Sequence, residues 1–299
     1  IKSKEFPEPL EKLNLQATAQ SDGTLRNSEF ALQNFSMSLQ NEPFSANAIF
    51  KNFEDINFDV KAKGVIDLTK ITKIYPLEGM KLSGRIKGNI ASEGKMSDIE
   101  KAQYEKITNS GDINLKDFVY ETTDMPVVKI SDAHLQFNPK EMILEKFEGS
   151  AGRSDMSLTG NLSNYLGYLF RDETIKGKFV FKSKKFDVNE WLSDSPTPEQ
   201  PTQDVPMTVV VIPKNIDFLL SSSIEEVIYD DLSLKTLQGD ILVKEGKISL
   251  GNGVFNTLGG DFSLTGTYDT QDEKKPKFDF DFGIKNLEIG EASKKFVTI

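Results

Sequence analysis

Three pairs of acidic residues, in adjacent or alternate positions, have a spacing that could allow catalysis or metal binding. Paired carboxylates can serve as the acid and nucleophile of a glycosidase or as calcium ligands. The pairs are Glu225 with Glu226, Asp230 with Asp231, and Asp279 with Asp281. The last pair alternates with phenylalanines, which is typical of the solvated face of a strand, and the sequence contains no Asp-x-Asp-x-Asp-Gly calcium loop. We interpret all three pairs as surface residues.

Histidine and cysteine chemistry is equally limited. His134 is the only histidine and there is no cysteine, which excludes disulfides, thiolate ligands and a zinc site with several imidazoles. His134 falls on the polar side of an alternating segment, 132–137, which indicates a solvent-facing structural role. The segments Gly251-Asn252-Gly253 and Gly259-Gly260 precede neither a helix nor Gly-Lys-Ser/Thr, so we expect turns and not phosphate loops. The sequence therefore predicts no enzyme activity, no catalytic residue, no metal and no cofactor.

Charge and hydropathy limit the classes of molecule that the chain could bind. The net charge of −10 and the presence of only four arginines argue against nucleic acid and against electrostatic docking on anionic lipid headgroups. The longest aliphatic run, 209–212, is far shorter than the roughly 20 residues of a membrane helix. No signal peptide is visible, and the chain begins with Ile1 in a polar segment. We expect it to be a piece of a longer protein.

The elements that position these residues are strands, because the dominant hydrophobic period is two. In 277–284, Phe278, Phe280, Phe282 and Ile284 share one face while charged residues share the other. The sequence predicts a mainly β fold: an elongated, repeated antiparallel sheet, curled into a groove or taco-like half-barrel. Short helices are expected at 67–75, 97–107 with Ser97 as the cap, 163–170 and 188–192.

The chain also repeats itself. Residues 154–160 and 260–266 are identical at five of seven positions, and a fainter copy of the segment that follows them occurs at 56–68. Such a period indicates an array of like units. We expect β-repeat units at 1–104, 105–192 and 207–299. The proline-rich acidic segment 193–206 has the composition of a linker.

Apolar residues that alternate in this way must face either a second sheet or an open groove, and periodicity does not distinguish the two. If a groove forms, its candidate lining residues are Phe58, Val60, Leu82, Ile86, Ile113, Leu115, Phe179, Phe181, Phe218, Leu220, Phe278, Phe280 and Phe282.

Several segments together resemble the AsmA family of Gram-negative envelope proteins: 6–15, 80–84, 94–106, 128–140, 213–218, 256–262 and 285–289. The resemblance covers essentially the whole chain. It implies the periplasmic part of an inner-membrane-anchored protein, similar to bridge-like lipid transfer proteins, that binds lipid acyl chains in an apolar groove. The implied role is phospholipid transport and outer-membrane biogenesis.

The partners implied by the resemblance are phospholipid acyl chains and the inner membrane, through an N-terminal helix that this chain lacks. Outer-membrane assembly proteins are a further candidate. The alternative is a non-catalytic structural or assembly module that affects outer-membrane protein targeting.

Overall fold

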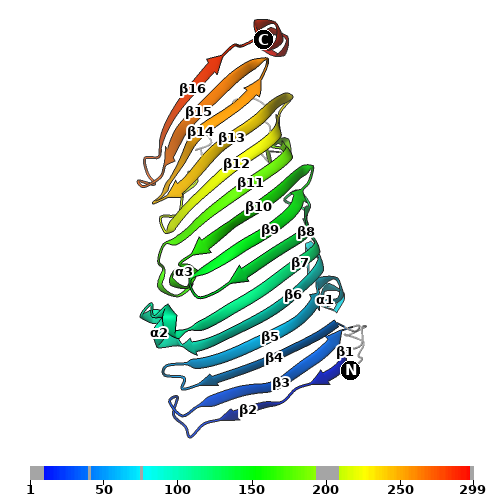
Figure 1. Ribbon diagram of the computed structural model, residues 1–299, viewed down its shortest axis with the longest axis vertical. Coiled ribbons are helices and arrows are strands. Elements are labelled where there is room, and N and C mark those ends of the chain that lie inside the picture. The colour runs from blue at the N-terminus through cyan, green and yellow to red at the C-terminus, as the bar shows by residue number, and fades with distance from the viewer. Residues whose placement is uncertain (1–9, 40–41, 75–76, 193–208, 297–299) are drawn as a thin grey trace. The chain divides into compact units, whose positions relative to one another are not determined.

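The computed structural model describes residues 10–39, 42–74, 77–192 and 209–296 (Figure 1). All 16 strands belong to one mixed sheet that is not closed into a barrel, and five short helices accompany it. The mainly β fold class predicted from the sequence is confirmed. The predicted linker at 193–206 lies outside the described residues.

The 16 strands are between 4 and 16 residues long. The first nine are β1 (Leu10–Asn14), β2 (Ala17–Gln20), β3 (Glu29–Leu39), β4 (Glu42–Lys51), β5 (Asn57–Asp67), β6 (Met80–Lys95), β7 (Thr108–Thr122), β8 (Val128–Phe137) and β9 (Glu141–Ala151). The others are β10 (Ser154–Ser163), β11 (Ile175–Asp187), β12 (Ile216–Tyr229), β13 (Leu232–Lys244), β14 (Lys247–Thr257), β15 (Gly260–Asp269) and β16 (Lys277–Lys285).

The hydrogen-bonded order of the strands is their order in the sequence from β3 to β16, and both β1 and β2 pair with β3. One pairing corrects the expectation of an antiparallel sheet, because β11 and β12 are parallel. Parallel neighbours require a crossover connection. The chain between Asp187 and Ile216 provides it, and strand periodicity carries no information about this direction.

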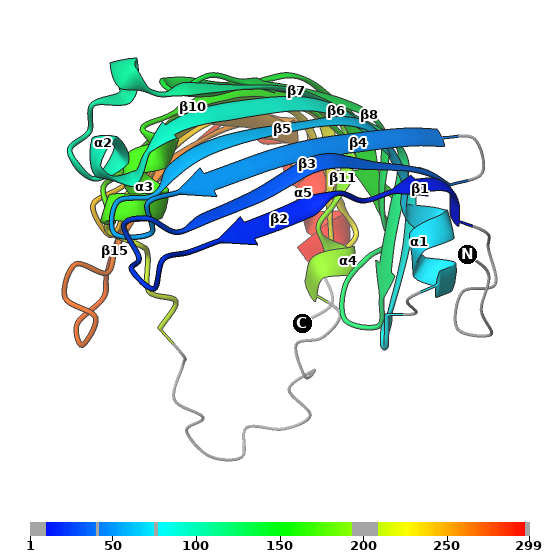
Figure 2. The same ribbon diagram turned by 90° about the horizontal axis from the view of Figure 1, so that it is seen from below.

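The chain folds as two compact units, each more densely packed within itself than against the other. Unit 1 comprises residues 1–123, 127–149 and 161–173, and unit 2 comprises 124–126, 150–160 and 174–299. Within unit 1, strands β4 to β7 bend along their length (Figure 2). The three-unit division expected from the sequence uses other boundaries and stays a prediction.

The helices are short and most follow strands. They are α1 (Leu68–Ile74), α2 (Met96–Glu100), the 3-10 turn η1 (Tyr104–Lys106), α3 (Tyr165–Arg171), α4 (Asn189–Leu192) and α5 (Ile289–Phe296). The expected helices at 67–75, 163–170 and 188–192 are confirmed with small shifts in their ends. Helix α5 was not predicted.

The expected helix at 97–107 is wrong in length and in its cap. It breaks into α2 and η1, and the N-cap residue of α2 is Lys95. Ser97 lies inside α2, where its hydroxyl donates to Asp55 Oδ2 (2.8 Å) and its backbone N–H donates to Asp55 Oδ1 (2.9 Å). A carboxylate from the β4–β5 turn thus performs the capping that the sequence suggested for the serine.

The internal repeat is visible in the element order. The duplicated heptapeptides form the beginning of β10 and of β15. The next strand of each copy ends in a short helix, β11 with α4 and β16 with α5, although α3 precedes β11 in the first copy only. The fainter copy forms β5 followed by α1.

Fully buried apolar residues are few, and one group in unit 1 lies between short helices. Ile99 of α2 and Ile107 are buried, as are Tyr165 and Leu166 of α3. The Tyr165 hydroxyl donates to the Asn138 carbonyl (2.8 Å), and burial raises the pKa of Tyr165. Most apolar residues in the strand centres are only half-buried.

Candidate functional site

The predicted apolar residues of unit 1 gather on one face of its sheet, because residues directly opposite one another on paired strands share a face. Ile86 of β6 lies opposite Ile66 of β5 and Leu115 of β7. Ile113 of β7 lies opposite Gly88 of β6, so it follows Leu115 on the same face by strand alternation. Four strands, β5 to β8, continue this face, since Leu135 of β8 lies opposite Ile113.

Two more predicted residues extend the same face toward β3. Phe58 lies opposite Phe50, and Val60 lies opposite Ala48. Leu82 is separated from the others by a register shift between β6 and β7, and it lies opposite Tyr120.

The predicted residues of unit 2 form two apolar rows that cross β11 to β16. One row contains Gly177, Phe218, Val243, Ile248, Tyr268 and Phe278, and the next contains Phe179, Leu220, Ile241, Leu250, Gly266 and Phe280. Phe282 continues the second row's face opposite Leu264, and Phe181 lies opposite Ser222. The structure therefore brings predicted residues from separate sequence segments side by side within this unit.

Ring contacts join neighbours in these rows. The ring centroids of Phe179 and Phe218 are 5.9 Å apart in an edge-on arrangement, and those of Tyr268 and Phe278 are 4.7 Å apart and stacked. Gly266 has a specific part in this packing, because a Cβ added there would overlap a ring atom of Phe280. The glycine allows the ring to lie across the neighbouring strand.

The apolar faces are at least partly open. All strands of the described residues belong to one sheet, so no second sheet within the described ranges covers either face. On β16, Phe278, Phe280 and Phe282 are 62%, 56% and 57% exposed. Phe58, Val60 and Ile86, on inner strands, are half-buried.

The opposite face of unit 2 carries most of the polar residues of its strands, including Asp279 and Asp281 as the sequence predicted, together with some apolar ones such as Leu242. Asp279 and Asp281 lie opposite Thr267 and Thr265 on β15. The other acidic pairs also occupy exposed or partly exposed positions. Asp231 forms an ion pair with a lysine of α5 (2.6 Å), and Glu226 pairs with a lysine of β13.

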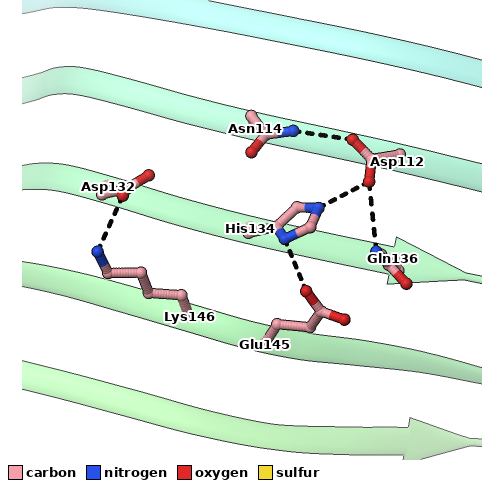
Figure 3. A network of polar contacts seen from close by, with 7 residues as sticks. All are labelled: Asp112, Asn114, Asp132, His134, Gln136, Glu145 and Lys146. Atoms are coloured by element: carbon pink, nitrogen blue, oxygen red, sulfur yellow. Dashed lines mark hydrogen bonds and ion pairs between the residues drawn. The ribbon is translucent and has the colours of Figure 1, made fainter.

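His134 lies on the polar face of unit 1 between two carboxylates (Figure 3). Its Nε2 is 2.7 Å from Asp112 Oδ2 and its Nδ1 is 2.8 Å from Glu145 Oε2. The hydrogen bond with Asp112 is the main cause that raises the pKa of His134, and the charges of Asp112 and Glu145 add to it. The same hydrogen bond lowers the pKa of Asp112.

The surrounding contacts are those of a surface ion-pair network. Asp112 also accepts hydrogen bonds from Asn114 (2.8 Å) and Gln136 (3.4 Å). The polar orientation of His134 could be predicted from β8 alone. Its two carboxylate partners could not, because they lie on β7 and β9. Among the residues that the structure describes, no group of three or more His, Cys, Asp or Glu side chains is placed to hold a metal ion.

No helix in the described part of the chain is long and apolar enough to cross a membrane. No protein-family model, curated protein or solved structure significantly matches the chain. The resemblance to the AsmA family therefore rests on the sequence segments alone.

Proposed function

We propose that each unit binds lipid acyl chains on the apolar face of its sheet and that this role is non-catalytic. The observation that carries the proposal is the recurrence of one apolar face on strand after strand without a second sheet over it in the described residues. A face of this kind matches the chemistry of a hydrocarbon chain and offers no charged group to it.

The energetics favour such a role. Exposing a hydrocarbon tail to water costs about 0.8 kcal/mol per CH₂ group, so a sixteen-carbon tail costs on the order of 10 kcal/mol. A surface of phenylalanine, leucine and isoleucine side chains removes much of this cost. Transfer between a bilayer and the protein then requires neither nucleotide hydrolysis nor strong headgroup recognition.

The resemblance to the AsmA family extends the proposal. In that setting the chain is the periplasmic part of a protein anchored in the inner membrane, and it serves phospholipid transport and outer-membrane biogenesis.

Site-specific photo-crosslinking tests the proposal with neighbouring residues on opposite faces. A photoreactive phenylalanine analogue replaces Phe280 or Asp279 in unit 2, and Leu115 or Lys116 in unit 1. We expect phospholipid adducts, identified by mass spectrometry, at positions 280 and 115 and not at 279 and 116. Equal labelling at both members of each pair, or no labelling at any position in a membrane-anchored full-length protein, would contradict lipid binding and favour the structural or assembly module.

A further inference from the structure

The polar face of unit 1 contains a hollow of about 640 Å³. Its lining includes Lys12 of β1, Ser36 of β3, Ser45 of β4, Lys63 of β5, and Lys87 and Asn89 of β6, and we call it the lysine hollow. Its volume lies within the range of small-molecule sites, which is about 300–1,000 Å³.

Strand register explains why these side chains meet. Ser36 lies opposite Ser45, Ser45 opposite Lys63, and Lys63 opposite Asn89. Neighbouring strands are about 4.8 Å apart, so this row places hydroxyl, ammonium and amide groups next to one another on one face. Lys87 belongs to the adjacent row, two residues from Asn89 on the same face.

The lining of the hollow also contains two glycines. Gly64 of β5 and Gly88 of β6 are directly paired, and both line the hollow. Pro43 and Val65 add apolar lining. The hollow therefore combines positive charge, hydrogen-bond donors and apolar surface.

Among the residues that the structure describes, no carboxylate pairs with the three lysines of the hollow. In the described part of the chain, Lys12, Lys63 and Lys87 form no ion pair, whereas Lys61, on the same strand and face as Lys63, pairs with Asp59 (3.2 Å). The one carboxylate in the lining, Asp112, is bound by His134 (2.7 Å). Three lysines without an ion pair in the described residues stand out around one hollow in a chain whose net charge is −10.

We propose that the lysine hollow binds the phosphate group of a small phosphate ester that also has an apolar part. Lysine is a common phosphate ligand because its ammonium group acts as a point charge with several donors. Ser36, Ser45 and Asn89 supply further donors, and the apolar part lies against Pro43 and Val65. This site is on the face opposite the apolar one, so it does not depend on acyl-chain binding there.

The phosphate ester can come from the headgroup of a lipid or from a soluble molecule, and three probes separate the sources. Isothermal titration calorimetry at low salt measures inorganic phosphate and hexyl phosphate, and co-sedimentation measures vesicles of phosphatidylcholine with phosphatidic acid. We expect hexyl phosphate to bind more tightly than inorganic phosphate. Binding to the vesicles as well identifies a headgroup, and binding to hexyl phosphate alone identifies a soluble ester.

The variants locate the site. Lys63→Gln with Lys87→Gln should weaken binding of hexyl phosphate at least tenfold. Lys61→Gln removes another exposed lysine two residues from Lys63, outside the hollow, and should change binding less than twofold. Circular dichroism confirms that each variant is folded. Absence of binding to all three probes, unchanged binding in the double variant, or equal weakening in Lys61→Gln would overturn the proposal.

Discussion

The side-chain contacts of the single histidine depend on the pairing of three strands. His134 of β8 contacts Asp112 of β7 and Glu145 of β9, and both carboxylates favour its protonated form. A shift of either neighbouring strand by one residue would move its carboxylate to the other face. The network is therefore specific to this register, although an exposed ion pair stabilises a fold only slightly.

We predict that His134 stabilises unit 1 more at acid than at alkaline pH. Its pKa is raised above the ordinary value of about 6.5. Its contribution is therefore complete below the unfolded-state pKa and is lost as pH rises through the folded-state pKa. His134→Gln should lower the free energy of unfolding by up to about 1 kcal/mol at pH 5.5, and by less at pH 9. Urea unfolding at both values measures this difference, and an equal loss at both would contradict it.

We predict that Gly266 is required for the packing of Phe280. In Gly266→Ala, the new Cβ would overlap the Phe280 ring and lie 2.7 Å from the Asp279 carbonyl oxygen. Such overpacking typically costs about 1–3 kcal/mol. The matched control is Gly251→Ala, where nothing lies within 4 Å of the added Cβ. Similar urea midpoints for both variants would show that the ring moves away without cost.

Among the elements, the turn between β9 and β10 is held by the helix that follows β11. Arg153 Nη2 is 2.9 Å from Asp187 Oδ2, and Arg153 Nε is 3.3 Å from Glu190 Oε1 of α4. The backbone N–H of Arg153 donates to Glu190 Oε2 (2.7 Å). The Asp187 side chain is only 5% exposed, so Arg153 supplies the counter-ion of a nearly buried carboxylate.

We predict that Arg153→Ala destabilises unit 2 by about 1–3 kcal/mol, because it leaves a buried carboxylate without its cation. The control is Lys244→Ala, which removes the partner of the more exposed carboxylate of Asp217 (3.4 Å) and should cost at most about 1 kcal/mol. Differential scanning calorimetry compares the two variants. Equal shifts in Tm would mean that Asp187 does not depend on Arg153.

At the scale of the elements, the sequence predicted those features that the alternation of residues within a single strand determines. The face of Phe278, Phe280 and Phe282 follows from their spacing alone. The lysine hollow could not be found in this way, because Lys12, Lys63 and Lys87 come from three strands and their proximity depends on register. The parallel pairing of β11 with β12 was missed because alternation looks the same in either direction.

Helix α5 was missed for a different reason. Its eight residues include few apolar ones, so its amphipathic pattern is short. The cap of α2 was misassigned because its true partner, Asp55, is distant in sequence. Sequence periodicity thus predicted most of the strands and their apolar faces. The features that it missed depend on contacts between strands or between distant segments.

At the scale of the molecule, each of the two compact units has its own apolar face and its own polar face. In unit 1 the two faces differ in chemistry enough to hold different ligands: half-buried hydrocarbon side chains on one face, and lysines with hydroxyl groups on the other. Acyl-chain binding and phosphate binding are therefore separable by substitution, since Ile86 and Lys87 are adjacent in sequence and point to opposite faces.

Unit 2 contains the parallel pair β11 and β12, and this pair predicts the behaviour of a cleaved chain. The two strands pair along almost their whole length, from Ile175 opposite Ile216 to Asp187 opposite Ile228. Beyond the last pair, Asn189 and Asp230 exchange two hydrogen bonds, of 3.0 Å and 2.7 Å. These contacts are independent of a covalent connection through 193–206.

We predict that a chain cut at a protease site inserted within 193–206 stays assembled, because β11 and β12 remain hydrogen-bonded neighbours on the inside of the sheet. The cut protein should elute from a sizing column at the volume of the intact chain and separate into two fragments only in denaturant. Leu220→Pro provides the comparison, since a proline in an inner strand removes a ladder hydrogen bond, and it should let the cut fragments separate at a lower urea concentration. Fragments that separate in native buffer without this substitution would show that the covalent connection, and not the parallel pairing, holds β12 against β11.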